Sequence, residues 1–168
     1  MSRGKAWKYG DDINTDVIFP GKYTYSVLEP GEMARHALED LDPGFAQSVK
    51  QGDVIVAGRN FGCGSSREQA ATCLKAAGVQ AVIAKSFARI FFRNAINQGL
   101  PVLQSAEAVD SLENGEEVDI DFASGKIKTG KGVFVFSSFP DSVLGILKEG
   151  GLIPYTKKRL KESLKRRC

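Results

Sequence analysis

Short apolar runs alternate with helix-like stretches through the first two thirds of the chain. The apolar runs that are short enough for buried strands lie at residues 53–57, 80–84 and 100–103. Two stretches with the length and periodicity of helices lie between them, residues 68–77 and 88–98, and they end at Gly78 and Gly99. This β-α-β-α-β order predicts an α/β fold with a parallel sheet covered by helices.

The two ends of the chain have different patterns. Residues 4–9 alternate as a first strand, and apolar positions in 32–41 predict an amphipathic helix. Three short alternating runs separated by glycine turns predict an antiparallel β meander, at residues 117–121, 126–128 and 133–136. A short helix is expected at 141–148.

The length of 168 residues suits one domain, which we expect to span residues 1–155, followed by a basic tail at 156–168. Residues 157–167 hold seven Lys or Arg and one Glu, a net charge of +6, so the rest of the chain carries −3 of the total +3. An acidic body argues against a nucleic-acid module, and the tail is expected to be a solvated helix. No apolar stretch has the length of a membrane span, which predicts a cytoplasmic protein without membrane contact.

The cysteines are too few and too widely spaced for a metal site. Cys63, Cys73 and Cys168 form neither a C-x-x-C pattern nor a disulfide framework, and His36 is the single histidine. We therefore expect no metal or iron–sulfur cluster bound by this chain.

The stretch from Gly58 to Ala70 has the strongest chemical signal. It joins an apolar run to a helix through a glycine turn, so backbone N–H groups would meet an anion at the start of the helix, beside the guanidinium of Arg67. The alternative is simple capping, with Ser65 paired to Glu68 or Ser66 to Gln69 as a capping box. The pattern alone leaves both alternatives open. Neither glycine-rich nucleotide motif fits, because no lysine precedes the serines and G-x-G-x-x-G is absent.

The same stretch, GRNFGCGSSREQA, resembles the active-site loop of the aconitase-type swivelling domain. Two further stretches, GDDINTDVIFPGKY and AKSFARIFFRNAINQGLPV, resemble the same family in the same order, and together they span most of residues 4–155. In that superfamily the domain can stand alone as the small subunit of 3-isopropylmalate dehydratase or of homoaconitase. The resemblance implies a single β/β/α swivelling domain that combines the parallel sheet with the meander.

The resemblance also implies roles for particular residues. Ser65 would abstract the substrate proton, while Gly64, Ser66 and Arg67 would bind the substrate, Arg67 through a carboxylate. Thr15 and Asp16 would order the active site, although an Asx-rich turn with Asp16 bonded to nearby backbone is the plain alternative. Thr24 and Tyr25 lie in the loop that discriminates substrates in the family, with Lys22 close by.

A cofactor and a partner follow from the resemblance as well. A [4Fe–4S] cluster is expected on a large partner subunit, in a heterodimer or heterotetramer, with a di- or tricarboxylate as substrate. The uncharged Tyr25 suits an apolar branch and so favours isopropylmalate, whereas Lys22 would suit an extra carboxylate. A homoaconitate or dimethylmalate-type dehydratase subunit, or a stand-alone anion-binding module, are the alternative interpretations.

Overall fold

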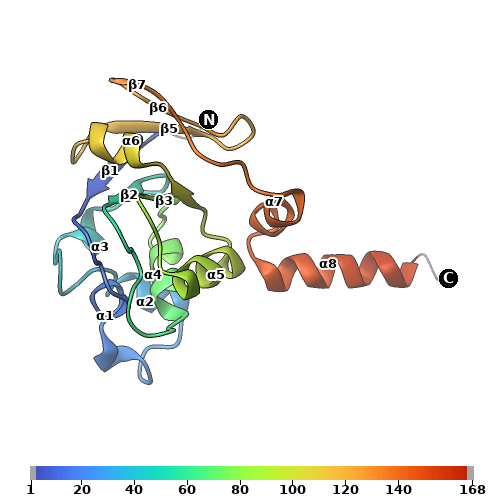
Figure 1. Ribbon diagram of the computed structural model, residues 1–168. Coiled ribbons are helices and arrows are strands. Elements are labelled where there is room, and N and C mark those ends of the chain that lie inside the picture. Colours follow the sequence, from blue (N-terminus) through green and yellow to red (C-terminus); the bar gives the residue numbers. More distant parts are fainter. Residues whose placement is uncertain (1–2, 166–168) are drawn as a thin grey trace.

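The computed structural model describes residues 3–165, in which seven strands are hydrogen-bonded in the order β4-β3-β2-β1-β5-β6-β7 (Figure 1). The strands are β1 (Arg3–Lys8), β2 (Val54–Ala57), β3 (Ala81–Ala84), β4 (Val102–Gln104), β5 (Glu117–Asp121), β6 (Lys126–Thr129) and β7 (Gly132–Val135). The helices are α1 (Thr15–Ile18), α2 (Pro30–Ala34), α3 (Phe45–Ser48), α4 (Gln69–Ala76), α5 (Arg89–Gln98), α6 (Ala106–Ser111), α7 (Asp141–Lys148) and α8 (Leu152–Lys165), with a 3₁₀ turn, η1 (Gly21–Tyr23).

Strand β1 is shared by a parallel and an antiparallel half of the sheet. Its residues Ala6–Lys8 pair in parallel with β2, which continues in parallel to β3 and β4. Its residues Arg3–Lys5 pair antiparallel with β5, and β5, β6 and β7 follow as consecutive antiparallel strands. The predicted parallel sheet and the predicted meander are both confirmed.

Both faces of the parallel strands are buried, which explains why these strands are continuous apolar runs. On one face, Ile55 and Ala57 pack in a core with Leu74 of α4 and Phe91 of α5. On the other face, Val54 and Val56 share a second core with residues from α6 and the meander. The meander members of that core are Val118, Ile120 and Ile127. The layers are therefore meander, parallel sheet and helices, the β/β/α arrangement that was expected (Figure 1).

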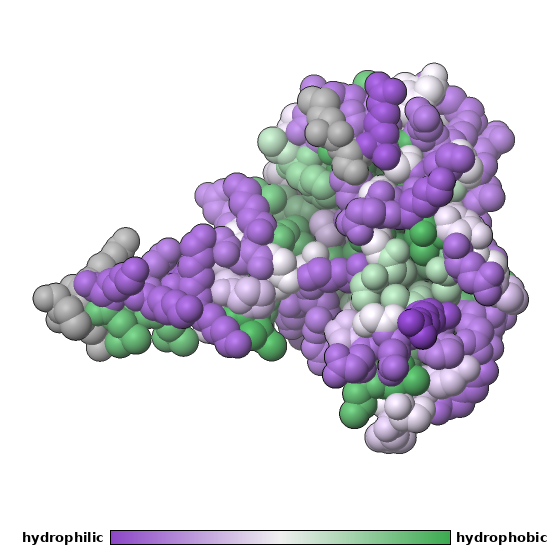
Figure 2. All heavy atoms as spheres, turned by 180° about the vertical axis from the view of Figure 1, so that it is seen from behind, coloured by the Kyte–Doolittle hydropathy of each residue, from purple (hydrophilic) through white to green (hydrophobic). Residues whose placement is uncertain are grey.

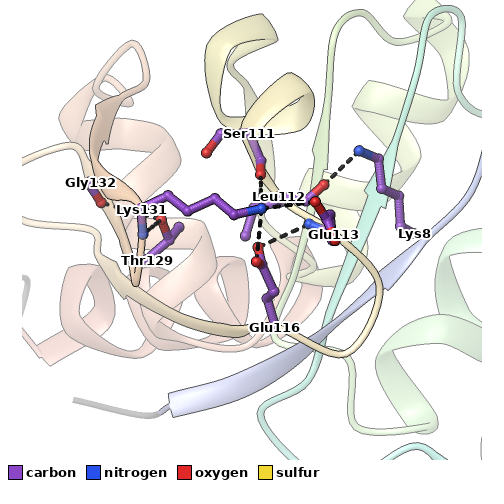
Figure 3. A network of polar contacts seen from close by, with 8 residues as sticks. All are labelled: Lys8, Ser111, Leu112, Glu113, Glu116, Thr129, Lys131 and Gly132. Atoms are coloured by element: carbon purple, nitrogen blue, oxygen red, sulfur yellow. Dashed lines mark hydrogen bonds and ion pairs between the residues drawn. The ribbon is translucent and has the colours of Figure 1, made fainter.

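A lysine ties the meander to the segment after α6. Lys131, in the turn between β6 and β7, donates from Nζ to Ser111 O at 2.9 Å and lies 3.1 Å from Glu113 Oε1 and 2.9 Å from Glu116 Oε1. Figure 3 shows these contacts, together with the bond from Lys8 Nζ of β1 to Leu112 O at 2.5 Å. The same short segment is thus held from both halves of the sheet.

The predicted helix over residues 32–41 is wrong in its extent. Helix α2 ends at Ala34, and turns follow as far as residue 41. Leu38 is fully buried with a φ of 56°, and its N–H donates to Ile18 O at 2.8 Å rather than to a helical carbonyl. Packing of Leu38 into the core and its bond to the end of α1 therefore replace the helix that its apolar periodicity predicted.

The chain ends in two helices beyond the meander. Helix α7 confirms the helix expected at 141–148, and α8 runs from Leu152 through the described part of the basic tail. Figure 2 shows α8 as a projecting arm with apolar side chains along one side. The exposed apolar residues of this helix include Ile153, Leu160 and Leu164. No helix among residues 3–165 combines the length and the apolar character that crossing a membrane requires.

Candidate active site

The glycine turn between β2 and α4 is anchored in the core. Phe61 is fully buried, donates from its N–H to Ser86 O at 3.0 Å, and packs edge-on against Phe91 with ring centroids 5.1 Å apart. Gly62 has a φ of 79°, and a Cβ there would lie 2.1 Å from Phe91 Cγ. Only glycine satisfies both the backbone angle and the close approach of α5, so the turn is fixed to the helix behind it.

The N-terminal N-T-D segment lies directly against this turn. Asn14 caps α1 by accepting a hydrogen bond from Val17 N at 2.9 Å, and Thr15 N donates to Cys63 O at 2.8 Å. Thr15 is buried, whereas Gly64, beside it in the turn, is exposed and has a φ of 96°. Two segments about 50 residues apart in the chain are thereby joined at one edge of the parallel sheet.

Ser65 is exposed, and its hydroxyl is held from two sides. Thr15 Oγ1 lies 3.1 Å from Ser65 Oγ and donates to Ser65 O at 3.0 Å. Arg67 Nε donates to Ser65 Oγ at 3.0 Å. A permanent positive charge that donates to a hydroxyl oxygen favours the alkoxide form over the neutral one. The arrangement therefore suits a serine that acts as a base toward a molecule approaching from solvent.

Arg67 is the hub of the site. Besides Ser65, its guanidinium donates from Nη1 to Thr24 Oγ1 at 3.0 Å and from Nη2 to Asp16 Oδ1. The Arg67 side chain is only 15% exposed, whereas Asp16 is 64% exposed. Asp16 thus pairs with Arg67 instead of nearby backbone. A guanidinium has five N–H donors, and these three bonds leave two for a carboxylate.

The two serines do not cap α4, so the predicted capping boxes are wrong. The N-cap of α4 is Glu68, which has helical backbone angles and no side-chain capping bond. Ser65 turns its hydroxyl to Thr15 and Arg67 instead, and Ser66 is exposed on the surface of the loop. Neither hydroxyl is therefore used to cap the helix, and both serines are exposed.

The loop after η1 contributes one of its two predicted residues to this cluster. Thr24 is bonded to Arg67, and its carbonyl accepts from Gln69 Nε2 at 3.4 Å. Tyr25 is 93% exposed, so its ring does not pack in the site. Lys22 Nζ lies 2.8 Å from Glu39 Oε1, where it is engaged by a carboxylate of this chain.

The cysteines of the described residues do not form a cluster site. Cys73 is fully buried, and burial raises the pKa of its thiol. Burial and the neighbouring Asp12 also raise the pKa of Cys63, and both shifts oppose the thiolate form that binds iron. Within residues 3–165 no three His, Cys, Asp or Glu side chains gather as metal ligands, and Cys168 lies outside the described residues.

The structure gives supporting roles to three residues that were not predicted as site residues. Asn14 caps α1, Gln69 supports Thr24, and Glu39 holds Lys22. The Asn-Thr-Asp order was a readable helix-start signal for Asn14. Glu39 had no such signal, because its contact with Lys22 depends on how the turns after α2 fold back.

The comparisons with known proteins cover the site to different extents. The family model for the aconitase C-terminal domain matches residues 32–108, which include Ser65 and Arg67 but not Thr15, Asp16 or Thr24. The 3-isopropylmalate dehydratase small subunit of Caldicellulosiruptor saccharolyticus is 54% identical over 162 residues, which are 95% of this chain and 93% of that protein. The small subunit 1 of the same dehydratase from Archaeoglobus fulgidus is 54% identical over 156 residues, 92% of this chain and 96% of that protein.

A solved structure is similar over nearly the full length. The crystal structure of 3-isopropylmalate dehydratase (leuD) from Methanocaldococcus jannaschii matches with a TM-score of 0.91 and 44% identity, covering 98% of each chain. The similarity therefore includes both halves of the sheet and the segments that carry the cluster around Arg67.

Proposed function

The chain belongs to the family of 3-isopropylmalate dehydratase small subunits, and on this premise we propose that it is the swivelling subunit of such a dehydratase. The enzyme would be a hydro-lyase that interconverts 2- and 3-isopropylmalate by removing water and adding it back in the opposite sense, a step of leucine biosynthesis in the cytoplasm. The observation that supports the catalytic role is the exposed Ser65 hydroxyl, with Arg67 Nε at 3.0 Å and Thr15 Oγ1 at 3.1 Å.

Ser65 is proposed as the base. In the dehydration of 2-isopropylmalate, the Ser65 alkoxide takes a proton from the CH₂ carbon, the electrons of that C–H bond form the double bond, and hydroxide leaves from the neighbouring carbon. The adjacent guanidinium stabilises the alkoxide before the transfer. In rehydration, hydroxide adds to the former CH₂ carbon, and the protonated serine returns its proton to the carbon that had lost hydroxide.

Arg67 is proposed to bind a substrate carboxylate through its two remaining N–H donors. Thr24 accepts one N–H of Nη1 and Asp16 accepts one N–H of Nη2, and these two bonds fix the plane of the guanidinium. One N–H remains on each Nη nitrogen, and two donors held in one plane suit the two oxygens of a carboxylate. The exposed Ser66 and the backbone at Gly64 line the same loop and would contribute further donors.

The other half of the reaction is the departure of hydroxide, and the described residues of this chain offer no ligand set for a metal cluster that would assist it. We therefore assign that half to a large partner subunit carrying a [4Fe–4S] cluster, in a heterodimer or heterotetramer. A cluster with an open iron supplies Lewis-acid chemistry to a bound hydroxyl. The exposure of Ser65 at the edge of the sheet fits a site that is completed by a second subunit.

The engagement of Lys22 supports isopropylmalate over a tricarboxylate. A free lysine beside Thr24 would suit a third carboxylate, but this lysine is paired with Glu39 at 2.8 Å. The uncharged Tyr25 offers no cation either. A ratio of kcat/KM that favours homocitrate-type tricarboxylates in the reconstituted complex would instead support the homoaconitate interpretation.

The test of this proposal compares the two neighbouring serines in the reconstituted two-subunit complex. Ser65→Ala removes the base and is expected to lower kcat by roughly 10²–10⁴-fold. Ser66→Ala is the matched control, since it removes a hydroxyl from the next position, and kcat is expected to stay within about tenfold of wild type. Turnover retained by Ser65→Ala and lost by Ser66→Ala would place the base one residue later.

A further inference from the structure

Glu39 is shared by three side chains from two segments. Its Oε1 lies 2.8 Å from Lys22 Nζ and accepts from Tyr23 Oη at 3.1 Å, and its Oε2 lies 2.5 Å from His36 Nδ1. The rings of Tyr23 and His36 are stacked with centroids 3.8 Å apart, and Lys22 Nζ lies 4.9 Å from the centroid of the Tyr23 ring. One carboxylate therefore holds two of the three residues of η1.

The backbone at Leu38 places Glu39 beneath η1. Leu38 is a buried residue with a φ of 56°, a conformation that a bulky side chain rarely adopts. Its N–H bond to Ile18 O at 2.8 Å ties it to the last residue of α1, whose first residue is Thr15. Strained residues of this kind persist where the surrounding structure requires them. The position of Glu39 is thus set by the same helix that carries part of the active site.

The residue after η1 is held by a second set of contacts. Thr24 accepts from Arg67 Nη1 at 3.0 Å through its hydroxyl and from Gln69 Nε2 at 3.4 Å through its carbonyl. Glu39 therefore holds Lys22 and Tyr23, and Arg67 holds Thr24. Thr24 directly follows Tyr23 in the chain. A shift of η1 therefore moves the Thr24 hydroxyl oxygen, which accepts the hydrogen bond from Arg67.

We propose that Glu39 is a positioning residue for substrate binding: it fixes η1, and through Thr24 it sets the plane of the Arg67 guanidinium. This inference rests on the proposed function of Arg67 as the carboxylate clamp. Hydrogen bonds from Lys22 and His36 lower the pKa of Glu39 to about 2, so the carboxylate is charged at neutral pH. The ion pair with Glu39 also balances the positive charge of Lys22 beside the site.

The experiment measures KM and kcat for isopropylmalate in the reconstituted complex. Glu39→Gln keeps the size of the side chain and removes its charge. If Arg67 binds the substrate and the transition state equally well, loosening it through Glu39→Gln should raise KM by about tenfold while kcat stays within about twofold. Glu113→Gln is the matched control, because it also removes a carboxylate paired with an exposed lysine, Lys131, but lies in the meander layer.

A double-variant cycle tests whether the effect passes through Thr24. Thr24→Val removes the hydroxyl that accepts from Arg67. If Glu39 acts through this hydroxyl, the change in KM from Glu39→Gln should largely disappear when Thr24→Val is already present. Independent, additive changes in KM would show that Glu39 acts by another route and would overturn the inference.

Hydrogen exchange of the full chain without its partner separates this inference from the proposed function. Glu39→Gln should increase exchange in a peptide covering residues 20–28 and leave peptides of the meander unchanged, and Glu113→Gln should do the reverse. Unchanged exchange at 20–28 together with an unchanged KM would overturn the role of Glu39. Increased exchange at 20–28 in a protein whose wild-type complex lacks dehydratase activity would reject the proposed function and leave only the first part of the inference, that Glu39 fixes η1.

Discussion

Arg67, in the candidate active site, and Lys131, in the meander, are two cations that each contact three oxygen acceptors. Lys131 uses its three N–H donors on Ser111 O, Glu113 and Glu116, so its bonding capacity is filled (Figure 3). Arg67 uses three of five donors and is more deeply buried, with its side chain 15% exposed against 41% for Lys131. Lys131 has no N–H donor left and serves to stabilise the fold. Arg67 stabilises the fold as well and keeps two N–H donors that a ligand could accept.

The largest effect is expected from exchanging the two cation types at the active site. Arg67→Lys keeps the charge but cannot contact Asp16, Thr24, Ser65 and a carboxylate at once, because an ammonium has only three donors. We expect kcat/KM of the reconstituted complex to fall about 100-fold, the equivalent of roughly 3 kcal/mol. Lys131→Arg is the reciprocal control and should leave kcat/KM within about twofold. A near-wild-type kcat/KM for Arg67→Lys would show that the active site does not need the additional N–H donors of arginine, and would contradict the comparison with Lys131.

A smaller effect is expected from deleting the meander cation. Lys131→Gln breaks two exposed ion pairs, and such pairs contribute about 1 kcal/mol or less to stability. Urea unfolding should show a loss of that size in the free energy of unfolding, and kcat should be unchanged. A substantial loss of kcat would mean that the meander network reaches the active site.

The smallest effect concerns acid. Hydrogen bonds from Lys131 and from the backbone N–H of Glu113 lower the pKa of Glu116 below its ordinary value of 4.5. The stabilisation of the folded state by ionised Glu116 is complete above about pH 4.5. It is lost as the pH falls through the lowered pKa that Glu116 has in the folded state. The difference in unfolding free energy between wild type and Lys131→Gln should therefore shrink as the pH falls below about 4.5. A difference that stays constant down to the acid unfolding transition would contradict this account.

The sequence was sufficient where local patterns and packing agree. The run before Gly58 and the helix that ends at Gly78 were predicted because a buried strand and a glycine cap are local signals. The expected helix at 32–41 failed because Leu38 leaves the helical conformation to reach the core. Apolar periodicity records that a residue is buried, and it does not record the backbone angle at which it is buried.

The active site was predicted in its residues more fully than in its contacts. Ser65 and Arg67 were named from the loop motif, but the bond between Arg67 and Asp16 joins residues 51 apart in the chain. The contact of Glu39 with Lys22 spans 17 residues across an irregular turn. No spacing rule for helices or strands covers such pairs, so only the folded chain brings them together.

Strand β1 is the first strand to be synthesised, and its two partners, β2 and β5, follow later in the chain. Arg3 pairs with Asp119 and Lys8 with Val56, so the first half of this strand waits for the meander while the second half waits for β2. An unpaired strand edge invites pairing with other chains. During synthesis, the nascent domain therefore carries an open edge until the chain has grown past residue 119. A fragment that stops before Glu117 would contain the serine loop and the helices around it, and would keep that edge permanently.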